Sequence, residues 1–185
     1  MKDFKQLYNE ASLSRVYSHT QKRNIAIISA QRQQYTKREN DKRTAELKTD
    51  IRRNGFGFLT VKGKYEEINP ETNQKETVTE TSFLIIGPEN DDKNKTKQFA
   101  ISLGKKYQQD SVLIKQPNDD KAYLVGTNST GFPGLGKKQP LGKWHPNRTS
   151  EYMTALKGTK NKTFVFENIK FETSKSFFNR KVVEF

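Results

Sequence analysis

The sequence predicts an α+β fold: a ferredoxin-like (split βαβ) sheet with two packed helices, followed by a C-terminal extension with β-strands. Two observations support this prediction. Short apolar runs and two segments with helical spacing follow one another in the order β-α-β-β-α-β. The chain has 185 residues, which is enough to bury a core without disulfides. Because crossovers between parallel strands are right-handed, we expect both helices on one face of the sheet.

The first strand is predicted over 25–30, where six residues form a short and mostly apolar run. A helix follows. Thr36 and Glu39 have the spacing of a capping box, in which each side chain bonds the backbone N–H of the other residue. We expect this helix to end at Asn54, with Gly55 as the stop residue.

The remaining elements of the core follow from alternation and helical spacing. Polar and apolar residues alternate over 56–65 and 78–86, which predicts two strands joined by a polar turn. Apolar residues at helical spacing predict a helix over 96–107. Two further apolar runs, at 111–115 and 122–125, predict two more strands.

The last third of the chain is harder to assign. Five Gly and three Pro within 126–148 predict a surface loop without regular structure. A short helix is expected over 150–157, and strands or strand-like arms over 163–166, 169–171 and 181–185.

These assignments divide the chain into three parts. Residues 1–125 form the α/β core domain, and its first segment, 1–24, has helical spacing. Residues 126–148 form a basic Gly/Pro-rich loop, and residues 149–185 form an extension packed on the core.

Composition limits the function. The formal net charge is +13, and there is no cysteine, which excludes a disulfide scaffold and a cysteine nucleophile. No apolar run approaches the length of about 18 residues that a membrane span requires. The cations are segregated: 126–148 contains no acidic residue, whereas acids dominate in 66–92. This segregation favours a face that attracts a polyanion, although solubility alone is an alternative explanation.

Nucleic acid is the polyanion that the residue pattern favours. Cations near an indole ring are typical of single-strand binders, in which cations follow the backbone and the ring stacks on a base. The candidate contact residues are Lys137, Lys138, Lys143, Trp144, Arg148, Arg52 and Arg53. Two other interpretations remain open: Trp144 anchors the loop to the core, and the two arginines complement the dipole at the end of a helix.

Candidates for catalysis are few. Glu80 and Ser82 fall on one face of a predicted strand, and Asp110 immediately precedes another, so the three side chains would converge if both strands belong to one sheet. The alternative is an ordinary solvent-facing strand. No His, Asp and Glu cluster has the spacing of a metal site, and no cofactor is predicted.

The stretch from Leu13 to Val125 resembles an uncharacterised family of phage and bacterial α/β domains of unknown function. The segments that show the resemblance are Leu13 to Tyr17, Ile27 to Arg32, Glu39 to Arg43, Gly55 to Phe58, Gly63 to Tyr65, Glu80 to Phe83 and Lys106 to Val112. The resemblance implies a phage or mobile-element source and assigns no catalytic residue.

The sequence therefore predicts a phage-type accessory protein, non-catalytic, that binds DNA or RNA or another polyanion through phosphate contacts. We expect it in the host cytoplasm or the virion, with no membrane association. One alternative is a small enzyme that acts on a nucleotide-like anion through Glu80, Ser82 and Asp110. Another is a virion structural or cargo component whose partners are packaged DNA, virion proteins or a host protein.

Overall fold

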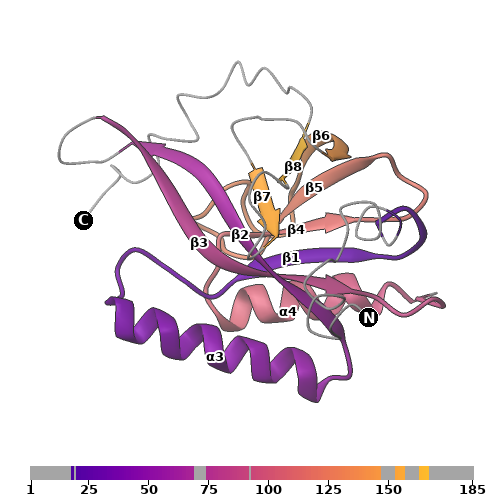
Figure 1. Cartoon of the computed structure of the whole chain (residues 1–185), viewed down its shortest axis with the longest axis horizontal. Helices are drawn as coiled ribbons and strands as arrows, with labels where there is room; N and C mark the ends of the chain where they lie inside the picture. The colour runs from indigo at the N-terminus through magenta and orange to yellow at the C-terminus, as the bar shows by residue number, and fades with distance from the viewer. Residues whose placement is uncertain are drawn as a thin grey trace, which may run out of the picture.

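The structure is a computed structural model and describes residues 18, 20–68, 74–91, 93–146, 153–156 and 163–166. Figure 1 shows the arrangement of the elements. In chain order they are β1 (Ile25–Ser29), α3 (Lys37–Arg53), β2 (Gly57–Ile68), β3 (Lys75–Ile86), α4 (Lys95–Lys106), β4 (Ser111–Lys115), β5 (Lys121–Gly126), β6 (Lys138–Pro146), β7 (Met153–Leu156) and β8 (Thr163–Phe166).

The predicted α+β fold is confirmed. Four strands lie in the order β4-β1-β3-β2, and every neighbouring pair is antiparallel, as the split βαβ arrangement requires. Both α3 and α4 lie on the same side of this sheet (Figure 1). The capping box at the start of α3 is present, because Thr36 and Glu39 bond each other's backbone N–H groups.

The sheet continues beyond these four strands and closes into a barrel. β5 pairs with β4, and the order continues through β6, β8 and β7 back to β2. The strand predicted over 163–166 is confirmed, whereas the helix predicted over 150–157 is wrong. Met153–Leu156 is instead a strand, because its backbone pairs with the otherwise open edge of β2.

The expectation that 126–148 lacks regular structure is also wrong, because β6 occupies its second half. Pro140 is tolerated there because the β5–β6 register shifts between Ala122 and Tyr123, and a proline at such an irregularity costs no ladder hydrogen bond. The first half remains a loop that closes on itself. The N–H of Gly126 donates to the carbonyl oxygen of Lys137 at 2.9 Å.

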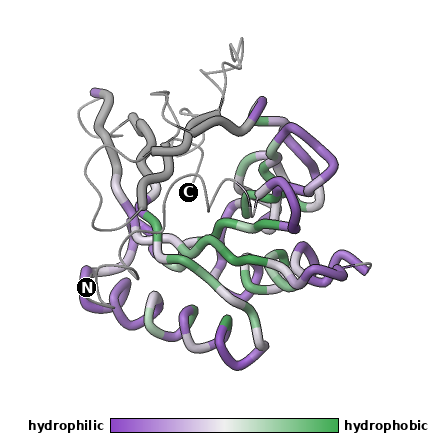
Figure 2. Tube along the Cα trace, turned by 45° about the vertical axis from the view of Figure 1, so that its right-hand side comes forward, coloured by the Kyte–Doolittle hydropathy of each residue, from purple (hydrophilic) through white to green (hydrophobic). Residues whose placement is uncertain are grey.

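The core lies between the sheet and the two helices. Leu47 of α3 and Leu103 of α4 pack with Ile28, Phe83 and Ile85 of the central strands. Burying each such side chain contributes roughly 1.5–3 kcal/mol. Figure 2 shows the hydrophobic colours along the central strands, while most of α3 is hydrophilic. The thin apolar face of α3 explains why only two of its residues are buried.

The opposite face of the same strands lines the barrel. Ile27, Leu84 and Leu113 lie side by side there, because Ile27 is the register partner of both other residues. All three are buried.

Several expectations fall outside the described residues: most of the helical segment 1–24, the strands over 169–171 and 181–185, and Arg148. Among the residues that the structure describes, no helix is both long and apolar enough to cross a membrane.

Candidate active site

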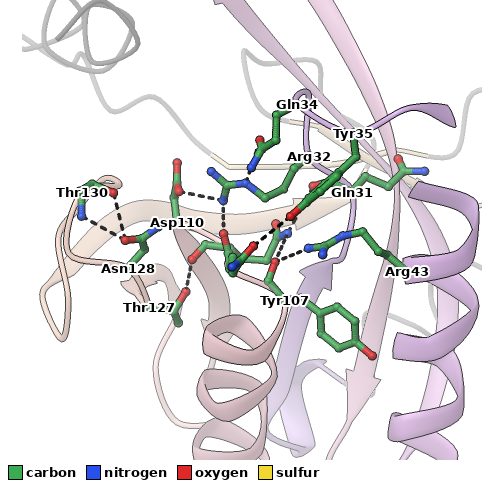
Figure 3. A network of polar contacts seen from close by, with 12 residues as sticks. Gln31, Arg32, Gln34, Tyr35, Arg43, Tyr107, Asp110, Thr127, Asn128 and Thr130 are labelled. Atoms are coloured by element: carbon green, nitrogen blue, oxygen red, sulfur yellow. Dashed lines mark hydrogen bonds and ion pairs between the residues drawn. The ribbon is translucent and has the colours of Figure 1, made fainter. Parts of the chain in front are cut away.

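Two chain segments meet where β1 ends (Figure 3). β1 continues into Gln31 and Arg32, and α4 ends at Tyr107 before the chain passes through Asp110 into β4. Because β1 and β4 are antiparallel neighbours, the end of the first lies beside the start of the second. The two segments therefore bring polar side chains from opposite halves of the core together.

The backbone of Arg32 is fixed by one side chain of helix α3. The Asn40 side chain accepts a hydrogen bond from the Arg32 N–H at 2.9 Å and donates to the Arg32 carbonyl oxygen at 2.9 Å. It also donates to the carbonyl oxygen of Tyr35 at 3.1 Å. Asn40 lies in the first turn of α3, so the capping box that begins this helix also positions the turn after β1.

The segment before β4 is fixed by a tight helix end. Gln108 has a φ of 55°, and the Gln109 N–H bonds back to the carbonyl oxygen of Gly104 at 2.8 Å. Thr127, which follows β5, donates its N–H to the carbonyl oxygen of Asp110 at 2.9 Å. Its hydroxyl donates to the carbonyl oxygen of Gln109 at 2.5 Å. The backbone that carries Asp110 is thus held from two sides.

Arg32 and Asp110 form an ion pair with an N–O distance of 3.1 Å. The side chain of Arg32 is 22% exposed and that of Asp110 is 48% exposed, so both charged groups are partly open to solvent. Arg32 also donates to the backbone carbonyl oxygen of Gln108 and, at 3.2 Å, to the side-chain oxygen of Gln34.

A cavity of about 610 Å³ lies against this ion pair. Its lining residues are Arg32, Gln34, Lys105, Gln108, Thr127, Asn128, Ser129 and Leu135. A volume of this size falls within the range of roughly 300–1,000 Å³ that small-molecule sites occupy. We refer to this cavity together with Asp110 as the Arg32–Asp110 site.

Arg43 of helix α3 joins the two segments that form the site. It donates to the carbonyl oxygen of Ala30 at 2.8 Å and to that of Tyr107 at 2.6 Å. Its guanidinium also lies 4.4 Å from the ring centroid of Tyr35 (Figure 3). Arg43 therefore sets the distance between the end of β1 and the end of α4.

The candidates Glu80 and Ser82 lie on β3, which flanks β1 on the side opposite β4. Ser82 is the register partner of Ser29, and both are buried. Glu80 is the register partner of Gly63, and a Cβ added at Gly63 would lie 3.4 Å from the Ser82 hydroxyl oxygen and 3.6 Å from Glu80 Cγ. All three candidates, Glu80, Ser82 and Asp110, thus lie toward the same end of the sheet.

Gln31 connects β3 to the Arg32–Asp110 site. Its side-chain oxygen accepts from the N–H of Thr81 at 3.0 Å, and its carbonyl oxygen accepts from the Gln109 side chain at 3.3 Å. One polar network therefore runs from the neighbourhood of Glu80 to that of Asp110.

The described residues among those predicted to contact nucleic acid lie on helix α3 and on or next to strand β6. Lys137 and Lys138 are exposed, whereas Lys143 is paired with Asp120 at 3.2 Å. The guanidinium of Arg52 lies 5.6 Å from the centroid of the Phe58 ring. The last turn of α3 also contains Arg53, as the helix-dipole interpretation expects. The side chain of Trp144 lies outside the described part of the structure, as does all of Arg148.

A second cavity, of about 460 Å³, lies at the other end of β1, and we call it the Asn24 cavity. Its lining residues are Lys22, Arg23, Asn24, Pro88, Glu89, Asp91, Asn94, Gln116, Pro117, Asn118 and Asp119. In it, Asp91 caps α4 by accepting from the N–H groups of Lys95 at 2.6 Å and Thr96 at 3.1 Å. Burial alone would raise the pKa of Asp91, but hydrogen bonds from Thr96, Asn24 and Lys95 outweigh it and hold that pKa below its usual value.

Within the described residues, no group of three or more His, Cys, Asp and Glu side chains is placed to hold a metal ion. The fold and the first cavity instead define a small α+β protein with a charge-paired pocket of a size that suits a metabolite.

The model of the S-adenosylmethionine lyase family matches residues 26–169, and the chain belongs to this family. One solved structure that resembles the chain is described as a phage SAM lyase in complex with S-methyl-5'-thioadenosine. It is 16% identical, covers 56% of this chain and 87% of its own, and superposes with a TM-score of 0.33. No curated protein matches the chain.

The family corrects the functional prediction from the sequence. A non-catalytic nucleic-acid binder or a virion component is wrong, because the family is one of enzymes that act on a small molecule. The prediction that nucleic acid is the partner is therefore also wrong. The prediction that the chain resembles a protein family is confirmed, but the expectation that this family has no known activity is wrong. The alternative of a small enzyme is the better interpretation.

Sequence reasoning missed Arg32, Asn40 and Arg43 as site residues. A signal was present, since the segments from Ile27 to Arg32 and from Glu39 to Arg43 both belong to the stretch with the family resemblance. Charge alone did not single out Arg43, because arginines near acids on a helix are explained equally well by intrahelical ion pairs.

Proposed function

We propose that this protein is an S-adenosylmethionine lyase and that the Arg32–Asp110 site binds the substrate. The observation that supports this is the extent of the family match, residues 26–169, which encloses every lining residue of that site. Lys22, Arg23 and Asn24 of the other cavity fall outside the match. We place the reaction in the host cytoplasm, in keeping with the phage-type resemblance of the sequence.

The chemistry of the substrate identifies the bond that breaks. A lyase cleaves without water, so the group that displaces the sulfonium sulfur comes from the substrate itself. The α-carboxylate can reach its own γ-carbon and close an unstrained five-membered ring. A C–O bond then forms, the C–S bond breaks, and its electron pair stays on sulfur. The products are S-methyl-5'-thioadenosine and a lactone.

In this route the enzyme supplies position and environment rather than a proton. A carboxylate anion and a sulfonium cation neutralise each other in the transition state, so a site with little water favours the reaction. Holding the flexible methionyl chain in the folded conformation accelerates ring closure further. We propose that Arg32 orients the carboxylate of the substrate and that Asp110 binds its ammonium group. The substrate thereby replaces the ion pair that the two residues form with each other.

A second route remains within the same activity. If a base removed a proton from the β-carbon, the same thioether would leave together with an unsaturated amino acid. Glu80 is the carboxylate that would serve, since it lies toward the same end of the sheet and is half-buried. Deuterium at the β-carbon distinguishes the routes: it slows the elimination severalfold and leaves the ring closure nearly unchanged.

The test is direct. The purified chain is incubated with S-adenosylmethionine, and S-methyl-5'-thioadenosine is followed by chromatography and mass spectrometry. We expect the thioether to appear faster than in a sample without protein, which corrects for spontaneous decay, and we expect none of that excess with heat-denatured protein. A rate equal to the spontaneous background would refute the proposal.

A further inference from the structure

One apolar side chain stands out in the Arg32–Asp110 site. Leu135 is 54% exposed and is the large hydrophobic residue left open to solvent among the residues that the structure describes. Its side chain lines the 610 Å³ cavity, whose other lining residues are all polar or charged. The cavity therefore has two chemically different regions, a charged one at Arg32 and an apolar one at Leu135.

The backbone fixes Leu135 in this exposed position. It occupies a tight turn that is closed by a hydrogen bond of 3.0 Å from the Lys137 N–H to the Gly134 carbonyl oxygen. The residues on either side, Gly134 and Gly136, have φ values of 96° and 73°, which only glycine adopts without strain.

The turn is also anchored to the end of β5. The Gly136 N–H donates to the Gly126 carbonyl oxygen at 3.0 Å. A Cβ at Gly126 would lie 1.8 Å from the carbonyl oxygen of Gly134, so the contact requires glycine. A leucine displayed on so constrained a turn is preorganised for a ligand.

We infer that Leu135 packs against the purine ring of the substrate and selects for the adenosyl group. This inference rests on the proposed function. A sulfonium substrate of this kind has a charged aminocarboxylate at one end and, at the other, a flat purine whose ring faces can pack against an apolar side chain. With the charged end at Arg32 and Asp110, the purine lies toward Leu135. Asn128 and Ser129 are also lining residues of the cavity.

The test compares Leu135→Ala with Lys137→Ala, a matched control on the same loop whose exposed side chain does not line the cavity. Affinity for S-methyl-5'-thioadenosine, measured by calorimetry, should fall roughly tenfold in Leu135→Ala because the apolar contact is lost. KM for S-adenosylmethionine should rise by a similar factor with kcat within about twofold. Leu135→Phe should restore most of the affinity, because a phenyl ring stacks on a purine.

Three results would overturn the inference. Equal affinities in Leu135→Ala and the wild type would do so, as would an equal loss in Lys137→Ala. A change in oligomeric state of Leu135→Ala by light scattering would reassign the leucine to a contact between subunits. If the wild type does not cleave S-adenosylmethionine but binds the thioether in a Leu135-dependent way, the proposed function fails while purine binding at Leu135 stands.

Discussion

The two ends of β1 show how similar residues serve different purposes. Each end has a cavity and an arginine–carboxylate pair, Arg32 with Asp110 at one and Arg23 with Glu89 at the other. At the Asn24 cavity the side chain of Glu89 is 79% exposed, so its ion pair with Arg23 contributes little to stability. The half-buried carboxylate there, Asp91, already receives hydrogen bonds from the helix it caps.

At the Arg32–Asp110 site the supporting bonds are made differently. Asn40 and Arg43 bind backbone atoms of the two segments rather than the charged groups themselves. The backbone is thus fixed, while the side chains of Arg32 and Asp110 keep the solvent exposure that a substrate needs. The difference distinguishes a helix cap from a site in which neighbouring residues preorganise the binding groups.

The largest expected effect contrasts the two arginines. Arg32→Ala removes the cation that orients the substrate carboxylate, and we expect kcat/KM for S-adenosylmethionine to fall by about 100-fold or more. Arg23→Ala, at the other end of the same strand, should leave kcat/KM within about twofold. Steady-state formation of the thioether measures both. Equal losses in the two variants would mean that the ends of β1 do not differ in function.

A smaller effect is expected at Arg43, which acts as a positioning residue. Arg43→Leu removes the hydrogen bonds from Arg43 to the carbonyl oxygens of Ala30 and Tyr107, and we expect kcat to fall roughly tenfold with little change in KM. Arg43→Lys keeps one donor and should recover part of kcat.

The control for Arg43 is Arg53→Ala, an exposed position on the same helix. It should leave both constants unchanged. A rise in KM alone in Arg43→Leu, or a loss of folded protein by circular dichroism without a specific loss of kcat, would contradict a positioning role.

Features that depend on local patterns could be predicted from the sequence, whereas pairings between distant residues could not. The capping box at Thr36, the order of the first six elements and the apolar run of β1 are local patterns, and all were predictable. The pairing of β7 with β2 was not, because it joins residues far apart in the chain, such as Val61 and Leu156. Local spacing suggested a helix there, and a free strand edge overrode it.

The site was predictable only in part. Glu80, Ser82 and Asp110 were recognised as candidates, and they lie at one end of the sheet because the predicted strand order is correct. Arg32 could not be distinguished from other surface cations, since its role depends on a partner 78 positions away. Total charge misdirected the functional prediction, because a net charge of +13 describes solubility and attraction but not a cavity.

The smallest expected effect is at the Asn24 cavity. Asp91→Ala removes the cap from α4 and should lower the free energy of unfolding by about 1 kcal/mol at pH 7, with kcat/KM per folded molecule within about twofold.

The pKa of Asp91 is lower in the folded protein than in the unfolded chain, so its stabilisation is present above the unfolded value of 3.8 and is lost as the pH falls through the folded value. The difference in urea midpoint between wild type and Asp91→Ala should therefore be full at pH 7 and pH 5 and shrink below about pH 4. Other acids, such as Asp50, titrate in both proteins and cancel in this difference. A difference that stays constant down to pH 2 would show that Asp91 stabilises α4 through packing rather than through its charge.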